Sequence, residues 1–332
     1  MSTFLSRQRV LRLALGLSSL SMVAQAGSFD AVVVYGDSLS DNGNLFAATG
    51  QPGWPYYQGR RSDGPVAVEQ LAAALGAPLL DFAWIGATTG IGNYADGGTP
   101  TTLGAFSLPG MQGEFAATQA LLGPYLNSGL FIVWGGANDF LSHSPLDLTP
   151  QAIISRAVGD ELGIVTSLEL LGAHNILAPG MPDLGLTPYF QSQGPIAAAQ
   201  GSAVTDAYNA ALRSSLPSGV LFYDAATLLR SIVANPGAYG FTNVTDPCFD
   251  LTTATVCANP SQYLFFDDFH PTTATDGFVA EGFLAAVTPE PSTFVLILGG
   301  LALCVASVVR TKTALERPAA ERAQGGKAAA TE

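Results

Sequence analysis

The chain has 332 residues and a net charge of −13 at pH 7. Eight of its 13 basic residues lie in the terminal segments, so residues 27–309 hold five arginines against 23 acids, a net charge of −18. Such a surface repels nucleic acids and anionic membranes, which excludes nucleic-acid binding as a function.

The N-terminus has the three parts of a secretion signal. Arg7, Arg9 and Arg12 precede the apolar residues 13–23, and Ala24-Gln25-Ala26 is a small-residue cleavage site. The apolar run is too short to serve as a membrane anchor. We therefore expect residues 1–26 to be a signal peptide and the following domain to be exported.

Short apolar runs alternate with longer helical patterns between residues 29 and 287. The first run, Ala31 to Tyr35, is β-branched and continuous, as in a strand buried on both faces. The other predicted strands are 79–83, 130–134, 175–178 and 220–223. The predicted helices are 65–75, 149–171, 196–212 and 273–287. This alternation predicts an α/β domain whose parallel sheet is covered on both faces.

Local signals predict where some of these elements begin. Thr149 before Pro150 is typical of an N-cap, and Thr273 with Asp276 three residues later resembles a capping box. The last helix is therefore expected to open at Thr273. Residues 97–112, rich in glycine and proline, are expected to form a surface loop.

A serine follows the first strand in the sequence Gly36-Asp37-Ser38-Leu39. Open α/β sheets bind ligands at this carboxyl edge, and the N–H groups that follow can stabilise developing negative charge. Alone, the sequence also fits an ordinary turn in which Ser38 caps a helix. The decision depends on whether a base and oxyanion donors accompany Ser38.

His270 is the candidate base among three histidines. It lies before the last helix, and Asp267 three residues earlier is near enough to hold the imidazole through its Nδ1–H. A surface loop with solvated acids is the alternative. His174 precedes an apolar strand and is interpreted as structural, whereas His143 is a loop residue that could line the site.

Two glycine-containing segments end neighbouring strands at the same sheet edge. Asn138 follows Gly135-Gly136 after the strand 130–134, and Gly86 follows the strand 79–83. An amide side chain and a close-lying glycine N–H can both donate to an oxyanion. In isolation such segments are mostly turns. They are candidates for the oxyanion site because both follow strands that end at the same edge of the sheet as Ser38.

These residues resemble the GDSL, or SGNH, hydrolase family over roughly residues 29–287. The nucleophile block is closest to GDSLSDTGN of the lipase, lecithinase and haemolysin-like branch, and residues 59–65 (GRRSDGP) resemble its GRFSNGP stretch. Ile85 departs from the glycine block GGAT by replacing its first glycine. The remaining similar blocks are GAND at 136–139, PDLGLTP at 182–188 and DDFHPT, matching DxxHPT, at 267–272.

The resemblance implies a nucleophile at Ser38, a base at His270 and an orienting carboxylate at Asp267. It implies oxyanion donors at the Ser38 and Gly86 N–H groups and the Asn138 amide. The implied fold is a three-layer α/β/α sandwich with a flavodoxin-like five-stranded parallel sheet. The implied activity is carboxylic-ester hydrolysis through an acyl-enzyme, with no metal or cofactor.

The C-terminus predicts a membrane anchor beyond a hydrolase domain of residues 27–288. Residues 294–309 are uncharged and span roughly 24 Å as a helix, and basic residues follow from Arg310. A buried core helix is the alternative. Residues 289–310, which begin with Pro289-Glu290-Pro291, resemble a PEP-CTERM sorting signal. This resemblance implies an exosortase-type partner, a Gram-negative source and a periplasmic, cell-surface or extracellular location, with the protein anchored in the membrane until its C-terminus is processed. A polar basic tail, 311–332, is longer than that pattern expects.

The two cysteines Cys248 and Cys257 predict one local disulfide in an exported protein. Two free thiols are the alternative, and no zinc site is expected.

The expected substrates are lipid esters or esters of short- and medium-chain acyl groups. Polysaccharide deacetylation, acyl transfer by the same residues and a non-catalytic surface or matrix role remain alternatives.

Overall fold

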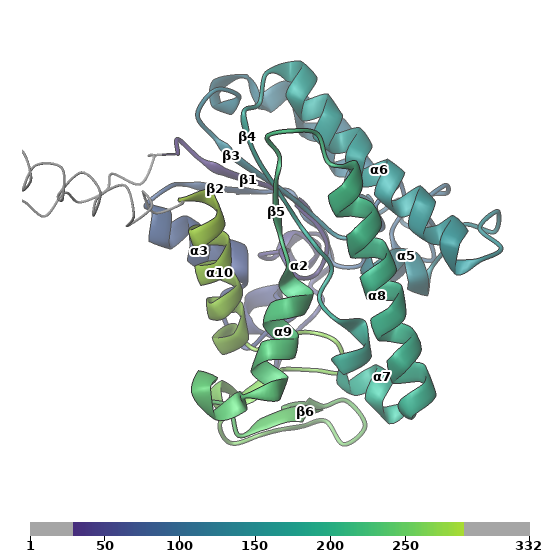
Figure 1. The fold of residues 1–332 in the computed structure, drawn as a ribbon, viewed down its shortest axis with the longest axis vertical. Helices are drawn as coiled ribbons and strands as arrows, with labels where there is room; N and C mark the ends of the chain where they lie inside the picture. The colour runs from purple at the N-terminus through teal and green to yellow at the C-terminus, as the bar shows by residue number, and fades with distance from the viewer. Residues whose placement is uncertain (1–28, 289–332) are drawn as a thin grey trace, which may run out of the picture. The chain divides into compact units, whose positions relative to one another are not determined.

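The computed structural model describes residues 29–288, which are built around a five-stranded, all-parallel sheet (Figure 1). Its order is β2-β1-β3-β4-β5, the flavodoxin-like order. The strands are β1 (Val32–Gly36), β2 (Leu79–Asp81), β3 (Leu130–Trp134), β4 (Asn175–Pro179) and β5 (Leu221–Tyr223). The bounds of each predicted strand are confirmed to within two residues. The predicted three-layer fold is confirmed as well.

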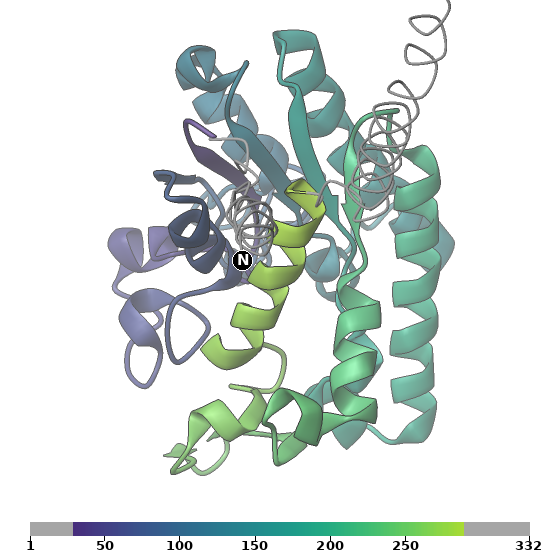
Figure 2. The ribbon, with the colours of Figure 1, turned by 60° about the vertical axis from the view of Figure 1, so that its left-hand side comes forward.

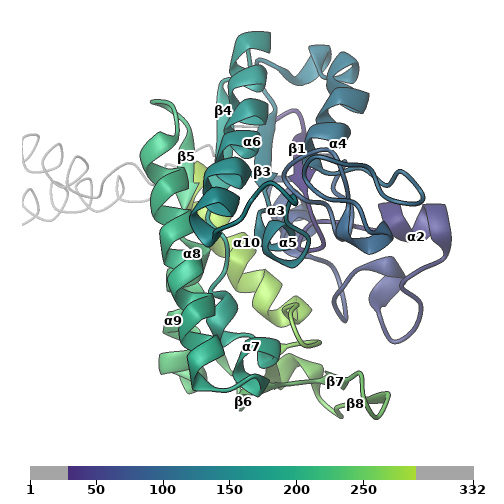
Figure 3. The same cartoon turned by 90° about the vertical axis from the view of Figure 1, so that its right-hand side faces the viewer.

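Helices cover both faces of the sheet, as Figure 3 shows from the side. Helices α3 (Ala67–Leu75) and α10 (Thr273–Val287) pack on one face, and in Figure 2 α10 crosses in front of the strands. Helices α4 (Met111–Thr118) and α6 (Pro150–Leu171) pack on the other, with α8 (Pro195–Ser215) beside α6. The four predicted helices are therefore present, each to within three residues.

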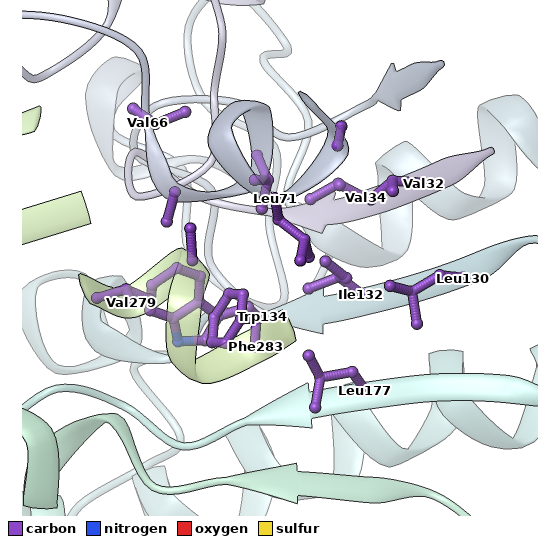
Figure 4. Close-up of a cluster of buried hydrophobic side chains, with 14 of the residues drawn as sticks. Val32, Val34, Val66, Leu71, Leu130, Ile132, Trp134, Leu177, Val279 and Phe283 are labelled. Carbon is purple, nitrogen blue, oxygen red and sulfur yellow. The ribbon is translucent and has the colours of Figure 1, made fainter. Parts of the chain in front are cut away.

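The alternation of side chains along the strands explains why the runs are apolar throughout. Val32 and Val34 of β1 point toward α3 and α10, together with Ile132 and Trp134 of β3 (Figure 4). The intervening residues point toward α4 and α6. Both sets are buried because successive residues of a strand face opposite sides of a sheet that is covered twice.

Some helix ends differ from the prediction. Thr149 caps α6 as predicted, and its side chain accepts from the Ala152 N–H at 3.1 Å. The cap of α10 is Thr272 rather than Thr273, because the Thr272 hydroxyl accepts from Thr275 N–H. The predicted loop 97–112 is also wrong at its end, where α4 begins at Met111.

Besides α4, four helices lay outside the prediction: α2 (Asn44–Thr49), α5 (Ala137–Leu141), α7 (Pro188–Ser192) and α9 (Ala225–Ala234). Three of them have five or six residues, too few to show a helical period. They follow strands or loops and stand at the carboxyl edge of the sheet or beyond it. There α5 carries Asn138, and α9 contributes the apolar residues Ala225 and Leu229 to a cavity described below.

Two small strand pairs precede α10. β6 (Asn243–Pro247) pairs with β9 (Tyr263–Phe265), and the hairpin β7 (Phe249–Asp250) and β8 (Thr255–Val256) lies between them in sequence. The structure joins Cys248 and Cys257 by a disulfide at the base of this hairpin. The disulfide thus closes the loop that leads into β9.

The predicted signal peptide, C-terminal anchor and basic tail lie outside the described residues. Within residues 29–288, no helix combines the length and the apolar character needed to cross a membrane.

Candidate active site

Ser38, His270 and Asp267 form one hydrogen-bonded chain at the carboxyl edge of the sheet. The Ser38 hydroxyl lies 2.8 Å from Nε2 of His270. On the other side of the ring, Nδ1 lies 2.8 Å and 2.9 Å from the two oxygens of Asp267. A hydroxyl, an imidazole and a carboxylate in this order can transfer the serine proton to the ring and stabilise the resulting charge.

The segment between β9 and α10 holds the side chains of Asp267 and His270 in place. Oδ1 of Asp267 accepts from the N–H groups of Phe269 and His270, at 2.9 Å and 2.8 Å. The Phe266 N–H donates to the His270 carbonyl at 2.7 Å and closes the loop. Residues 59–65 secure its end, because the Ser62 hydroxyl donates to the Pro271 carbonyl at 2.9 Å.

The charge of Asp267 is maintained despite its burial. Burial by itself raises the pKa of a carboxyl, but His270 opposes this through its charge and hydrogen bond, and the two backbone N–H groups add to it. The result is a pKa of about 2 for Asp267. The acid is therefore a carboxylate wherever His270 acts as a base.

Tyr56 is a member of this network that the sequence did not indicate. Its hydroxyl donates to Oδ2 of Asp267 at 2.8 Å, and its ring packs edge-on against Phe249 and Phe266. Burial and the adjacent Asp267 both raise the pKa of the hydroxyl, so it remains a donor. No motif marks Tyr56, which lies 211 residues from its partner in the sequence.

Donor groups face the nucleophile from the two neighbouring strands. Ser38 follows β1 and Asn138 follows β3, the pair of strands where the sheet order reverses and where ligands bind in this topology. The Asn138 amide donates to the Ala87 carbonyl at 3.0 Å, which fixes its orientation. Ser38, Gly86 and Asn138 all line one cavity.

Two of the predicted oxyanion donors are backbone groups that have no acceptor within residues 29–288, the N–H of Ser38 and that of Gly86. Gly86 has φ +82°, and a Cβ there would lie 2.5 Å from Oδ1 of Asn93, so this position requires glycine. The unusual Ile85 does not disturb it. The Ile85 N–H donates to Asp41 at 2.8 Å, which ties the glycine block to the nucleophile block.

The cavity that contains these groups has a volume of about 670 Å³. Its inner part is apolar and buried, and its rim carries half-exposed apolar side chains. The inner residues are Trp134, Ala225, Leu229, Phe265 and Val279, and the rim residues are Tyr94, Leu141, Tyr189 and Leu251. The volume lies in the range typical of small-molecule sites.

Two sequence candidates lie elsewhere. His143 does not line the cavity, and its Nδ1 contacts the Ser144 carbonyl at 3.0 Å. His174, interpreted as structural, is exposed before β4. In the described part of the chain, no cluster of three or more histidines, cysteines or acids has the arrangement of a metal site.

Comparison with known proteins gives a family match over most of the domain. The model of the GDSL-like lipase/acylhydrolase family matches residues 32–283. The chain is 29% identical over 255 residues to the phosphatidylcholine-sterol acyltransferase of Aeromonas hydrophila, across 71% of this chain and 70% of that protein. It is 26% identical over 286 residues to the thermolabile hemolysin of Vibrio parahaemolyticus, across 78% and 64%.

A third relative and a solved structure extend the comparison. The chain is 30% identical over 315 residues to esterase EstA of Pseudomonas aeruginosa, covering 80% of this chain and 48% of that protein. Among solved structures, it resembles a catalytic mutant of an acetylxylan esterase from Geobacillus stearothermophilus, with a TM-score of 0.44 and 14% identity over 79% of this chain and 95% of that one.

Proposed function

This chain belongs to the GDSL-like lipase/acylhydrolase family and is a serine ester hydrolase, and from that premise we propose that Ser38 is its nucleophile and fatty-acyl esters are its substrates. His270 takes the serine proton as Ser38 attacks the ester carbonyl, and Asp267 keeps the ring in the tautomer that accepts at Nε2. The tetrahedral oxyanion faces the Ser38 and Gly86 N–H groups and the Asn138 amide. Protonated His270 then donates to the leaving alcohol, and water hydrolyses the acyl-enzyme.

The apolar interior of the cavity is the observation that supports an acyl chain. Beyond Ser38 the wall is formed by apolar residues of β3, α9 and α10, among them Trp134, Ala225 and Val279, each less than a tenth exposed. An acetyl group is too short to contact those apolar residues. The methylenes of a longer acyl chain would leave water and pack against them, which is worth about 0.8 kcal/mol for each buried CH₂.

The test is an acyl-length profile on purified protein with esters of one chromophoric alcohol. We expect kcat/KM to rise about 3- to 4-fold for each methylene from acetyl to hexanoyl, as methylene burial requires. Ser38→Ala serves as the control for catalysis. A maximum at acetyl would contradict the proposal and would favour deacetylation.

A matched pair of variants tests where the acyl chain of the substrate binds. Ala225→Leu narrows the inner cavity and is expected to shift the optimum to shorter chains, whereas Leu141→Ala at the rim leaves the optimum in place. Melting temperatures of both variants show whether each remains folded. If the folded Ala225→Leu variant kept the same optimal acyl length, the acyl chain would bind elsewhere.

Acyl transfer is a second candidate, because one relative is named as an acyltransferase and is 29% identical over 71% of this chain. The same acyl-enzyme would pass its acyl group to an alcohol instead of water. Product analysis with an added alcohol separates the two. Formation of a new ester in proportion to alcohol concentration would establish transfer.

The location of the protein is a further part of the proposal. The signal-like N-terminus and the PEP-CTERM-like segment at 289–310 support export and a membrane anchor that an exosortase-type enzyme removes. Fractionation of the producing cells, with and without residues 289–332, tests this. Equal amounts of the two forms in the membrane would argue against the anchor.

A further inference from the structure

Gly86 and Asn138, two of the proposed oxyanion donors, come from segments that have little rigidity of their own. Gly86 lies in an irregular loop after β2, and Asn138 lies in α5, a helix of five residues. A misplacement of about 1 Å in an active site can cost on the order of 10²-fold in rate. The spacing between the loop and α5 therefore has to be fixed by contacts between them.

Asp139 of α5 makes such a contact with Thr89 of the loop. Its Oδ2 accepts from the Thr89 N–H at 2.9 Å, and its Oδ1 accepts from the Thr89 hydroxyl at 2.7 Å. Both residues are fully buried. Because both oxygens of one carboxylate bind the same residue, the contact fixes the orientation of the loop as well as its distance from α5.

This contact lies next to both donors. Asp139 directly follows Asn138, and Thr89 is three residues after Gly86. Between them the Asn138 amide donates to the Ala87 carbonyl at 3.0 Å, so α5 and the loop are joined at two neighbouring points. Asp139 does not line the cavity, and its carboxylate is therefore placed to act on the donors and not on the substrate.

We propose that Asp139 is a positioning residue for ester hydrolysis, which holds the Gly86 N–H and the Asn138 amide at the spacing that the tetrahedral oxyanion requires. This rests on the proposed hydrolysis at Ser38. A carboxylate suits the task because it accepts hydrogen bonds at both oxygens. Loss of the contact should leave binding of the ester intact and weaken stabilisation of the transition state.

The first measurement separates kcat from KM for a hexanoyl ester. Asp139→Ala is expected to lower kcat about 10- to 100-fold and to change KM by no more than about 2-fold. Asp139→Asn should keep at least about a third of the wild-type kcat, since its amide can accept from the Thr89 N–H and donate to the Thr89 hydroxyl. The assay is run at pH 8, because burial raises the pKa of Asp139 to about 7 and the carboxylate is the form that accepts both bonds.

Inhibitor binding reports on the oxyanion site itself. With hexyl trifluoromethyl ketone, the Ser38 oxygen bonds to the carbonyl carbon, the serine proton passes to His270 and the carbonyl oxygen becomes an oxyanion. Octanol occupies the cavity without forming one. In Asp139→Ala the affinity for the ketone should fall by the same factor as kcat, and the affinity for octanol should not change.

Thr89→Val tests the same contact from the other side and removes only one of its two bonds. We expect kcat to fall about 3- to 10-fold, while Thr89→Ser should behave as the wild type. In the Asp139→Ala background Thr89→Val should have no further effect, since the hydroxyl has already lost its partner. If Asp139→Ala does not fold, Thr89→Val and the ketone decide the question.

Asp96→Ala is the matched control. Asp96 is another buried aspartate that fastens a loop, because its Oδ2 accepts from the N–H groups of Phe106 and Leu108 at 2.9 Å and 3.0 Å. It does not line the cavity. Its removal should leave the ratio of the ketone and octanol affinities unchanged.

A wild-type kcat in Asp139→Ala, or equal weakening of both inhibitors, overturns the proposal, since Asp139 would then have no role or would shape the whole cavity. A loss in Asp139→Asn as large as in Asp139→Ala overturns it too, because charge and not spacing would matter. Failure of the proposed function gives a different result. In that case the wild type itself would neither hydrolyse the ester through Ser38 nor bind the ketone more tightly than octanol.

Discussion

Two buried aspartates near His270, Asp37 and Asp267, have pKa values that are shifted in opposite directions. Burial raises the pKa of Asp37, next to the nucleophile, to about 6, although the Leu39 N–H and His270 oppose it. Burial also acts on Asp267, yet His270 and the backbone N–H groups lower its pKa to about 2. Asp37 has one short hydrogen bond, from Leu39 at 3.0 Å, and a long one of 3.4 Å from Asn138.

Both carboxyls are buried, so the difference between their pKa values comes mainly from the charge and hydrogen bond of His270 on Asp267, with the backbone N–H groups adding to it. Asp267 accepts from His270, from two backbone N–H groups and from Tyr56. Asp37 lacks comparable partners and instead supports the turn that carries Ser38. From this difference we expect a charged, catalytic role for Asp267 and a structural role for Asp37.

Substituting each acid by its amide gives the largest expected contrast. Asp267→Asn should lower kcat/KM by about 10³- to 10⁴-fold, because an amide cannot hold the required tautomer or stabilise the imidazolium. Asp37→Asn should cost no more than about 10-fold, since the amide oxygen can still accept from the Leu39 N–H. Rates on a short chromophoric ester at pH 8 measure both. Similar losses in the two variants would remove the distinction.

Tyr56→Phe tests one donor of the Asp267 network. We expect kcat/KM to fall about 3- to 10-fold, less than the full value of a hydrogen bond to a charged group because three other donors remain. Because Tyr56 does not line the cavity, the loss should appear in kcat and leave KM unchanged. A loss that appears in KM instead would show that Tyr56 acts by shaping the cavity and not through Asp267.

The smallest expected effect concerns an acid with even fewer donors than Asp37. Glu161 of α6 is buried against Tyr208, whose hydroxyl donates to Oε2, while Oε1 has no partner in the described part of the chain. Burial raises the pKa of Glu161 to about 8, despite the Tyr208 bond. Between pH 4 and 8 the folded state keeps a proton that the unfolded state loses, so stability falls as pH rises.

Glu161→Gln removes the titrating carboxyl and keeps an amide oxygen that can accept from the Tyr208 hydroxyl. The drop in melting temperature between pH 5 and pH 9 should be smaller in this variant than in the wild type by at least about 2 °C. Exposed Glu281 on α10 gives the control substitution, Glu281→Gln, which should behave as the wild type. An equal drop in all three proteins would show that Glu161 does not titrate as described.

Much of the sheet could be predicted from the sequence because its runs are apolar on both faces and its longer helices are periodic. The residues of the site were also marked, since Ser38, Asn138 and Gly86 each follow a strand and the carboxyl ends of parallel strands share an edge. The roles assigned to them remain proposals for experiment.

Other features could not be read in this way, because they depend on contacts between distant segments. Tyr56 meets Asp267 only after the loop before α3 folds against the loop after β9, and no local pattern records that contact. The shift of the α10 cap to Thr272 has the same origin, since the Thr273 N–H donates to Asp63 across 210 residues. Short helices such as α5 are placed by the strand before them and carry no period of their own.

The most direct test of the account is covalent labelling with a fluorophosphonate, read by intact mass and by peptide mapping. We predict one label per chain, located on Ser38, and a fall in kcat of at least about 10⁴-fold in Ser38→Ala. His270→Ala should label far more slowly, because the serine would lack its base. A label on another residue, or Ser38→Ala with more than about a hundredth of wild-type turnover, would contradict the assignment of Ser38 as nucleophile.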